Sequence, residues 1–257
     1  MTQNKKLLIV FDLVATLTDA APRYVKAFEQ VCVRFGYPAP DPEEISAMLG
    51  NKNLKEIMAH FLGDIDDDLQ SLFMSSCNEE CDAMLFRPDW QEELFPHVKE
   101  TLEQLGQSGF QLGIYTGTRE NALNDQIHYH KIDHLFSKSY LRGKDNKRDA
   151  DLDSKSLKAQ QLSSLVDCFR QQTGDKNAPV LVIGDSEADF KAAQQMGFLF
   201  IGFAASPRKK QRLHATGIQT VMTDFSDLPL LIKTSFAKDE PTTPDYQQLK
   251  KKHPPKR

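Results

Sequence analysis

Residues 7–19 read LLIVFDLVATLTD, and more can be learned about the fold from this stretch than from any other. The stretch opens with an uninterrupted apolar run, which is typical of a parallel strand covered by helices on both faces. Asp12 follows directly, and Val14 occupies the second position after it. In sheets of this kind the ligand lies at the carboxyl ends of the strands. The segment therefore predicts a buried strand that carries a carboxylate into a ligand site.

The remaining chain divides into a helical block and an alternating block. From about residue 89 onward, apolar segments such as APVLVIGDS alternate with amphipathic ones, which predicts an α/β fold with a doubly wound parallel sheet. Residues 20–88 show helical periodicity and no strand pattern, so they are predicted to form an all-helical cap inserted into the sheet domain. We expect three regions: an α/β core (residues 1–19 and 89–236), the cap (20–88), and a disordered tail rich in proline and lysine (237–257).

Composition and charge exclude several classes of partner. The formal net charge of −4 over 257 residues is mild, and we expect no nucleic-acid partner for the body of the protein. No apolar segment approaches the roughly 18 uninterrupted residues of a membrane span, which predicts a cytoplasmic protein without membrane association. Nothing in the sequence indicates an oligomeric state.

Two later segments also place polar residues directly after predicted strands. QLGIYTGT leads into Thr116 and Gly117, and VLVIGDSEAD contains Gly184, Asp185 and Asp189. With Asp12 at the first strand, these motifs in this order resemble those of the haloacid dehalogenase-like hydrolase superfamily, in its phosphoglycolate phosphatase and phosphonatase branch. The resemblance spans about residues 6–220. It implies a Rossmann-like core with a helical cap.

The resemblance also implies a role for each matching residue. Asp12 would be the nucleophile that attacks phosphorus and becomes an aspartyl phosphate. Thr116 would hydrogen-bond the phosphoryl group of a small phosphorylated substrate, with Thr16 and Gly117 beside it. Mg²⁺, which prefers oxygen ligands, would be held by Asp12, Asp185 and the backbone carbonyl of Val14, with Asp189 supporting the site.

A lysine completes the catalytic set of this family, where it neutralises the phosphate and the nucleophile. Lys155, with Ser156 at a plausible helix start, is the preferred candidate, and Lys158 is the alternative. Lys155 ends a polar, highly charged segment, and Lys158 lies in the first turn of the helix predicted to follow it.

Val14 is where the chain departs from the family pattern. Family members carry a second Asp at this position, which protonates the leaving group and then activates water, and they carry Gly where this chain has Ala15. Val14 can transfer no proton. The main hypothesis is therefore a Mg²⁺-dependent phosphatase that favours substrates with good leaving groups.

Three alternatives stay open at this stage. Cleavage of a P–C bond, as in phosphonoacetaldehyde hydrolases, would use a cap lysine as a Schiff base, with Lys52 as the candidate and Lys55 behind it. Carbon–halogen hydrolysis needs no metal, and the intact GDSEAD segment argues against it. The third alternative is a phosphate-binding or scaffold protein that has lost turnover.

Overall fold

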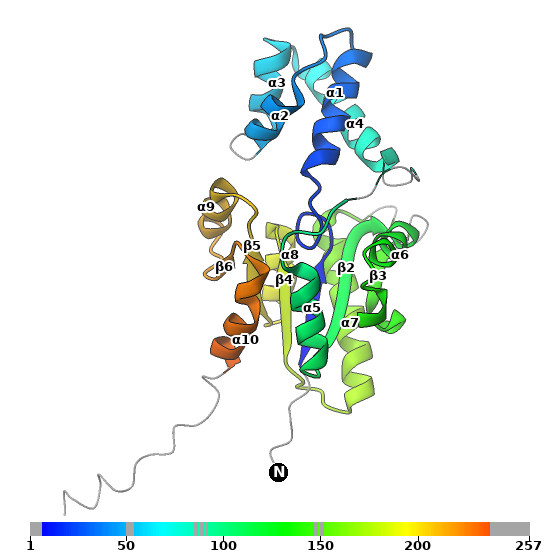
Figure 1. Cartoon of the computed structure of the whole chain (residues 1–257), viewed down its shortest axis with the longest axis vertical. Coiled ribbons are helices and arrows are strands. Elements are labelled where there is room, and N and C mark those ends of the chain that lie inside the picture. Colours follow the sequence, from blue (N-terminus) through cyan, green and yellow to red (C-terminus); the bar gives the residue numbers. More distant parts are fainter. Residues whose placement is uncertain are drawn as a thin grey trace, which may run out of the picture.

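A computed structural model describes residues 7–49, 54–84, 87, 90, 92–145, 149 and 152–236 (Figure 1). Lys52 and the predicted tail, residues 237–257, lie outside this described part. None of the helices in the described part combines the length and the apolar character that a membrane span requires.

A six-stranded parallel sheet forms the centre of the core, in the order β3-β2-β1-β4-β5-β6. The strands are β1 (Leu8–Asp12), β2 (Gln111–Arg119), β3 (Leu141–Lys144), β4 (Val180–Gly184), β5 (Leu199–Phe203) and β6 (Val221–Met222). The order reverses direction at β1, so β1 has β2 on one side and β4 on the other. This arrangement confirms the predicted doubly wound parallel sheet, with its switch point at β1.

Helices cover both faces of the sheet, as the apolar sequence of β1 requires. Ile9 and Phe11 face a cluster that includes α5 (Val98–Gln107), α6 (Glu120–Tyr129) and α10 (Leu228–Phe236). Leu8 and Val10 face the opposite cluster, which includes α7 (Ser154–Thr173) and α8 (Glu187–Gln195). The remaining helix of the core, α9 (Pro207–Ala215), lies between β5 and β6 in the chain. Because successive side chains of a strand point to opposite faces, the uninterrupted apolar run supplies both clusters.

A separate helical layer lies beyond the carboxyl ends of the strands (Figure 1). It consists of α1 (Ala21–Arg34), α2 (Pro42–Leu49), α3 (Leu54–Leu62) and α4 (Asp67–Met84), all of which lie between β1 and α5 in the chain. These helices share an apolar cluster of their own, with Phe28, Ile45, Ile57 and Phe73 among its buried members. We call this layer, residues 21–84, the cap.

The chain leaves the core and returns to it at one joint. Leu17 and Phe95 are linked by a backbone hydrogen bond of 2.9 Å, and Thr18 and Leu94 form an antiparallel bridge. At the same place Glu92 accepts from Arg23 Nε at 2.6 Å, and the side chains of this ion pair are 1% and 4% exposed. The joint between cap and core is therefore a buried polar contact directly above the end of β1.

Candidate active site

Three carboxylates meet at the carboxyl ends of β1 and β4. Asp12, Asp185 and Asp189 are buried, and one oxygen atom from each lies within 4.8 Å of the others. Burial disfavours the ionised form of a carboxyl group and raises the pKa of Asp12 to about 8, against the opposing effect of Lys158. Burial also raises the pKa of Asp185, although Lys209 opposes the shift. Three carboxylates this close together repel one another when ionised, so nearby cations stabilise the cluster.

Asp189 is fixed by the turn that begins α8. Its Oδ2 accepts from the backbone N of Ser186 at 3.1 Å and from Ser186 Oγ at 2.6 Å, and Ser186 Oγ in turn accepts from the backbone N of Asp189. This reciprocal arrangement is a capping box. Gly184 makes room for it, because a Cβ there would stand 2.6 Å from the Asp189 side chain. Ser186 thus holds Oδ2 of Asp189 in place beside Asp12 and Asp185.

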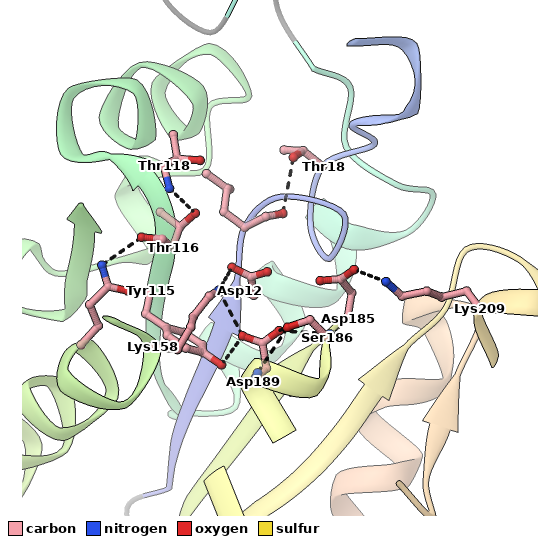
Figure 2. Close-up of polar contacts among 12 residues, drawn as sticks. Asp12, Thr18, Tyr115, Thr116, Thr118, Lys158, Asp185, Ser186, Asp189 and Lys209 are labelled. Carbon is pink, nitrogen blue, oxygen red and sulfur yellow. Dashed lines mark hydrogen bonds and ion pairs between the residues drawn. The ribbon is translucent and has the colours of Figure 1, made fainter. Parts of the chain in front are cut away.

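Lys158, on α7, is the lysine that reaches the carboxylates. Its Nζ forms an ion pair with Asp12 and lies 3.1 Å from Asp189 Oδ1 (Figure 2). It also lies 4.4 Å from the centre of the Tyr115 ring. Burial alone would lower the pKa of Lys158, but Asp12 and Asp189 outweigh burial and keep that pKa above its ordinary value.

The sequence favoured Lys155 as the catalytic lysine, whereas the structure places Lys158, the alternative, beside the carboxylates. Lys155 is exposed in the first turn of α7, whereas Lys158 is buried, as are Leu157, Gln161 and Leu162. Residues three positions apart lie on the same face of a helix, so the two lysines differ mainly in their position along α7. Lys155 stands at the exposed start of the helix, one turn before Lys158, where the buried part of α7 begins.

The carboxyl end of β2 forms the opposite wall of the site. Thr116 is buried, its Oγ1 accepts from the backbone N of Thr118 at 3.1 Å, and its carbonyl accepts from Gln161 Nε2 at 2.9 Å. Thr116 and Gly117 line a cavity of about 370 Å³ together with Asp12, Val14 and Lys158. Cap residues also line it, among them Arg23, Tyr24 and Asp82. The cavity therefore lies between the carboxylates and the cap.

The loop after β1 places Val14 and Thr16 differently. Val14 is half-buried and lines the cavity. Ala15, which follows it, has a φ of 60°, in the left-handed region where glycine is favoured. Thr16 is fully buried, and no group in the described part of the chain pairs with its Oγ1. The chain therefore turns sharply after β1 through a residue in a backbone conformation that favours glycine.

Three residues of the site were not singled out in the sequence. Tyr115 is fully buried and donates from its hydroxyl to Asp189 Oδ1 at 2.7 Å, and Gln161 holds Thr116. Lys209, on α9, lies with its Nζ 2.5 Å from Asp185 Oδ2. The basic run PRKKQR directly after β5 was the only sequence signal that could have pointed to Lys209.

The donor set fits a divalent cation. Mg²⁺ prefers oxygen ligands in octahedral geometry, and the three clustered carboxylates offer oxygen ligands from two neighbouring strand ends. The residues present therefore fit a hard cation, with Asp189 already engaged by four polar contacts from Tyr115, Ser186 and Lys158.

The sheet, the cap and the order of the three strand-end motifs define a class of hydrolase. The family described as haloacid dehalogenase-like hydrolase matches residues 9–203. The chain belongs to this family.

Several relatives share most of the length of this chain. It is 28% identical over 243 residues to a phosphoglycolate phosphatase of Vibrio parahaemolyticus, covering 91% of this chain and 100% of that protein. It is 29% identical over 194 residues to a phosphoglycolate phosphatase of Aliivibrio fischeri, covering 74% and 80%. Among solved structures, a putative phosphatase from Clostridium difficile aligns with a TM-score of 0.64 at 18% identity, covering 89% of this chain and 99% of that one. The last comparison supports the fold alone.

Proposed function

We propose that this protein is a Mg²⁺-dependent phosphatase that acts on a small phosphorylated metabolite through an aspartyl phosphate on Asp12. The observation that carries the proposal is the position of Asp12. It lies at the end of the switch-point strand, is paired with Lys158, stands within ligand distance of Asp185, and opens onto the cavity that Thr116 lines. Phosphoryl transfer needs an oxygen nucleophile, donors and positive charge in one crevice, and this cavity brings them together.

The residues of the chain divide the reaction between them. An oxygen of Asp12 attacks phosphorus, so that an O–P bond to Asp12 forms as the P–O bond to the leaving group breaks. Lys158 balances the charge of Asp12 and of the phosphoryl oxygens, and Thr116 with Gly117 lies where donors can meet those oxygens. Water then attacks the aspartyl phosphate, which releases inorganic phosphate and regenerates the carboxylate.

Mg²⁺ would be held by Asp12, Asp185 and the backbone carbonyl of Val14, with Asp189 supporting the site. When bound, it supplies positive charge that stabilises the transition state. A backbone carbonyl does not depend on its side chain, so the change to Val14 does not remove this ligand. It does remove the residue that would protonate the leaving oxygen, and that proton then has to come from water.

The relatives suggest the first substrate to test. Those described above carry the name phosphoglycolate phosphatase, and 2-phosphoglycolate is small enough for a cavity of about 370 Å³. Lys144 also lines this cavity and adds positive charge to its wall, whereas the charge of Arg23 is balanced by Glu92. We therefore propose small phosphorylated acids as the first class to examine.

Phosphate release from a panel of compounds tests the proposal. The panel contains 2-phosphoglycolate, other phosphomonoesters, an acyl phosphate and phosphonoacetaldehyde, each with Mg²⁺ and with a chelator. Lys158→Met and Lys155→Met form a matched pair on one helix, and we expect the first to abolish release while the second leaves it unchanged. Release that does not need Mg²⁺, or equal effects of the two lysine variants, would contradict the proposal.

The same panel separates the alternative of P–C bond cleavage. Acetaldehyde formed from phosphonoacetaldehyde, together with borohydride trapping on the cap, would support that reaction instead. Lys52, its candidate residue, lies outside the described part, and Lys55 is exposed on α3. If no compound releases phosphate and no lysine is trapped, the protein is better explained as a phosphate-binding one.

A further inference from the structure

Lys209 makes a close contact with the carboxylate cluster from the side of α9. Its Nζ lies 2.5 Å from Asp185 Oδ2, and its backbone N donates to Ser206 Oγ at the N-cap of the helix. Figure 2 shows Lys209 approaching Asp185 from the side opposite Asp12. The first turn of α9 therefore places a cation against a carboxylate that the proposed function assigns to the metal.

The two lysines of the cluster divide the three carboxylates between them. Lys158 contacts Asp12 and Asp189, whereas Lys209 contacts Asp185. When all three carboxylates are ionised, as metal binding requires, three negative and two positive charges give the cluster a formal charge of −1. A metal ion bound to Asp185 would meet the nearby ammonium of Lys209, and like charges at such separations repel strongly where water is partly excluded.

The two lysines differ in their freedom to move. The side chain of Lys158 is 8% exposed and lies inside the cluster, whereas the side chain of Lys209 is 21% exposed. Lys209 also lines a second cavity, of about 380 Å³, which reaches from Asp185 along α9 to the cap. Its ammonium can therefore leave Asp185 for this cavity by side-chain rotation, without a shift of the helix.

We propose that Lys209 is a tethered cation that competes with the divalent metal for Asp185 and so sets the metal affinity of the site. The proposal rests on the metal site of the proposed function. While Lys209 is paired with Asp185, its ammonium balances the charge of that carboxylate in the metal-free protein. Metal binding then has to break this ion pair, so the free protein binds Mg²⁺ weakly.

A calorimetric titration with Mg²⁺ alone tests the competition without any turnover. Lys209→Met removes the ammonium and keeps a side chain of similar length, and Lys209→Gln is a second neutral variant in case the first fails to fold. Lys210→Met is the matched control, because it makes the same change in net charge one residue away. The ammonium of Lys210 makes no ion pair within the described part of the chain. Lys209→Arg keeps the charge and serves as the rescue.

We expect the neutral Lys209 variants to bind Mg²⁺ about tenfold or more tightly than the wild type. In these variants the Asp185 carboxylate has no ion pair with Lys209 to break before it binds the metal. Lys210→Met and Lys209→Arg should stay within about threefold of the wild type. The rise in melting temperature on adding Mg²⁺ should also be larger in Lys209→Met, since a ligand that binds more tightly stabilises the folded state more.

Three outcomes would overturn the proposal. Weaker Mg²⁺ binding in Lys209→Met would mean that Lys209 positions Asp185 for the metal. Unchanged binding would mean that the ion pair is only structural, and an absence of Mg²⁺ binding in every variant would mean that no metal competes. The proposed phosphatase activity is judged separately by phosphate release in the wild type, so its failure is distinguishable from each of these results.

Discussion

The carboxyl ends of β1 and β4 lie side by side at the site, and they are built very differently. After β4, Ser186 and Asp189 satisfy each other in a capping box, and Tyr115 and Lys158 complete the bonds of Asp189. After β1, Ala15 adopts a positive φ and Thr16 Oγ1 is left without a partner in the described part of the chain. The carboxylate after β4 is thus held by several polar contacts, whereas Val14, after β1, offers an apolar side chain that can transfer no proton.

The largest effect should come from Asp12, the only carboxylate of the β1 motif that reaches the site. Asp12→Asn keeps the shape but removes the nucleophile, and we expect phosphate release to fall by about 10⁴-fold or more. Asp19→Asn is the control on the same segment, because its side chain caps the backbone of Ala21 and should leave the rate nearly unchanged. Trapping with beryllium fluoride should mark Asp12 in the wild type, and a complex on another residue would contradict the assignment.

The second-largest effect should come from Val14, which occupies the position of the Asp that protonates the leaving group. Val14→Asp, with Ala15→Gly to relax the turn, should raise the turnover of alkyl phosphates by about 10²-fold, because it returns a proton donor to the leaving oxygen. The gain should be much smaller for p-nitrophenyl phosphate, whose leaving group needs little protonation. Steady-state rates on the two substrates give the comparison, and an equal gain on both would show that the new Asp does not act as the acid.

A third effect is a pH dependence of stability in the metal-free protein. Burial raises the pKa of Asp12 to about 8, whereas an Asp in the unfolded chain ionises near about pH 4. The folded state therefore retains a proton that the unfolded state has released. The stability that this proton supplies is fully present below about pH 4 and is lost as the pH rises through about 8.

The measurement is thermal unfolding in the presence of a chelator, from about pH 5 to about pH 9. Asp12→Asn has no proton to lose at this position, so its melting temperature should fall less than that of the wild type over this range. Parallel curves for the two proteins would show that Asp12 is ionised throughout.

The turn after β4 should respond to the loss of its capping box. Ser186→Ala removes a helix cap and also a hydrogen bond to buried Asp189, and we expect it to lower the free energy of unfolding by about 2 kcal/mol. Asp153→Ala, at the exposed N-cap of α7, removes a cap alone and should therefore cost less than Ser186→Ala. Urea unfolding of the two variants gives both values, and equal costs would mean that the Asp189 contact adds nothing.

The smallest effect should come from Ala15. Because Ala15 has a φ of 60°, replacing it with Gly relieves an unfavourable conformation and should stabilise the protein by up to about 1 kcal/mol. Ala20→Gly is the contrasting variant, since Ala20 has a φ of −83° and is fully buried, and it should destabilise. Urea unfolding distinguishes the two directions, and a loss of stability in Ala15→Gly would show that the turn after β1 is not strained.

The sequence predicted the sheet because the apolar runs of the central strands are long and the motifs after them are in order. It did not predict β6, whose two residues are too short to carry a pattern. The preference for Lys155 over Lys158 differs from the structure for another reason. Two lysines three positions apart share a helix face, so which of them reaches the carboxylates depends on where α7 begins and how it lies along the sheet, and helix boundaries are read from sequence only to within a few residues.

The remaining site residues depend on tertiary contacts that no local pattern records. Lys209 reaches Asp185 from a helix that follows another strand, and Tyr115 looks like any aromatic residue of a buried strand until its hydroxyl is seen beside Asp189. Such contacts join residues that are far apart in the chain, whereas each strand-end motif consists of residues only a few positions apart in the sequence. The sequence therefore indicated the carboxylates of the site better than it indicated their partners.

The joint of the cap has a mechanical consequence. Because the outgoing and returning chains pair with each other at Thr18 and Leu94, both covalent connections of the cap pass through one short joint. Away from this joint, Arg208 of α9 pairs with Glu56 of α3 at 3.3 Å, which is an exposed contact of the kind that contributes little stability. Arg23 and Tyr24 follow the joint closely, so its pairing holds these two cap residues at the wall of the cavity that Asp12 lines.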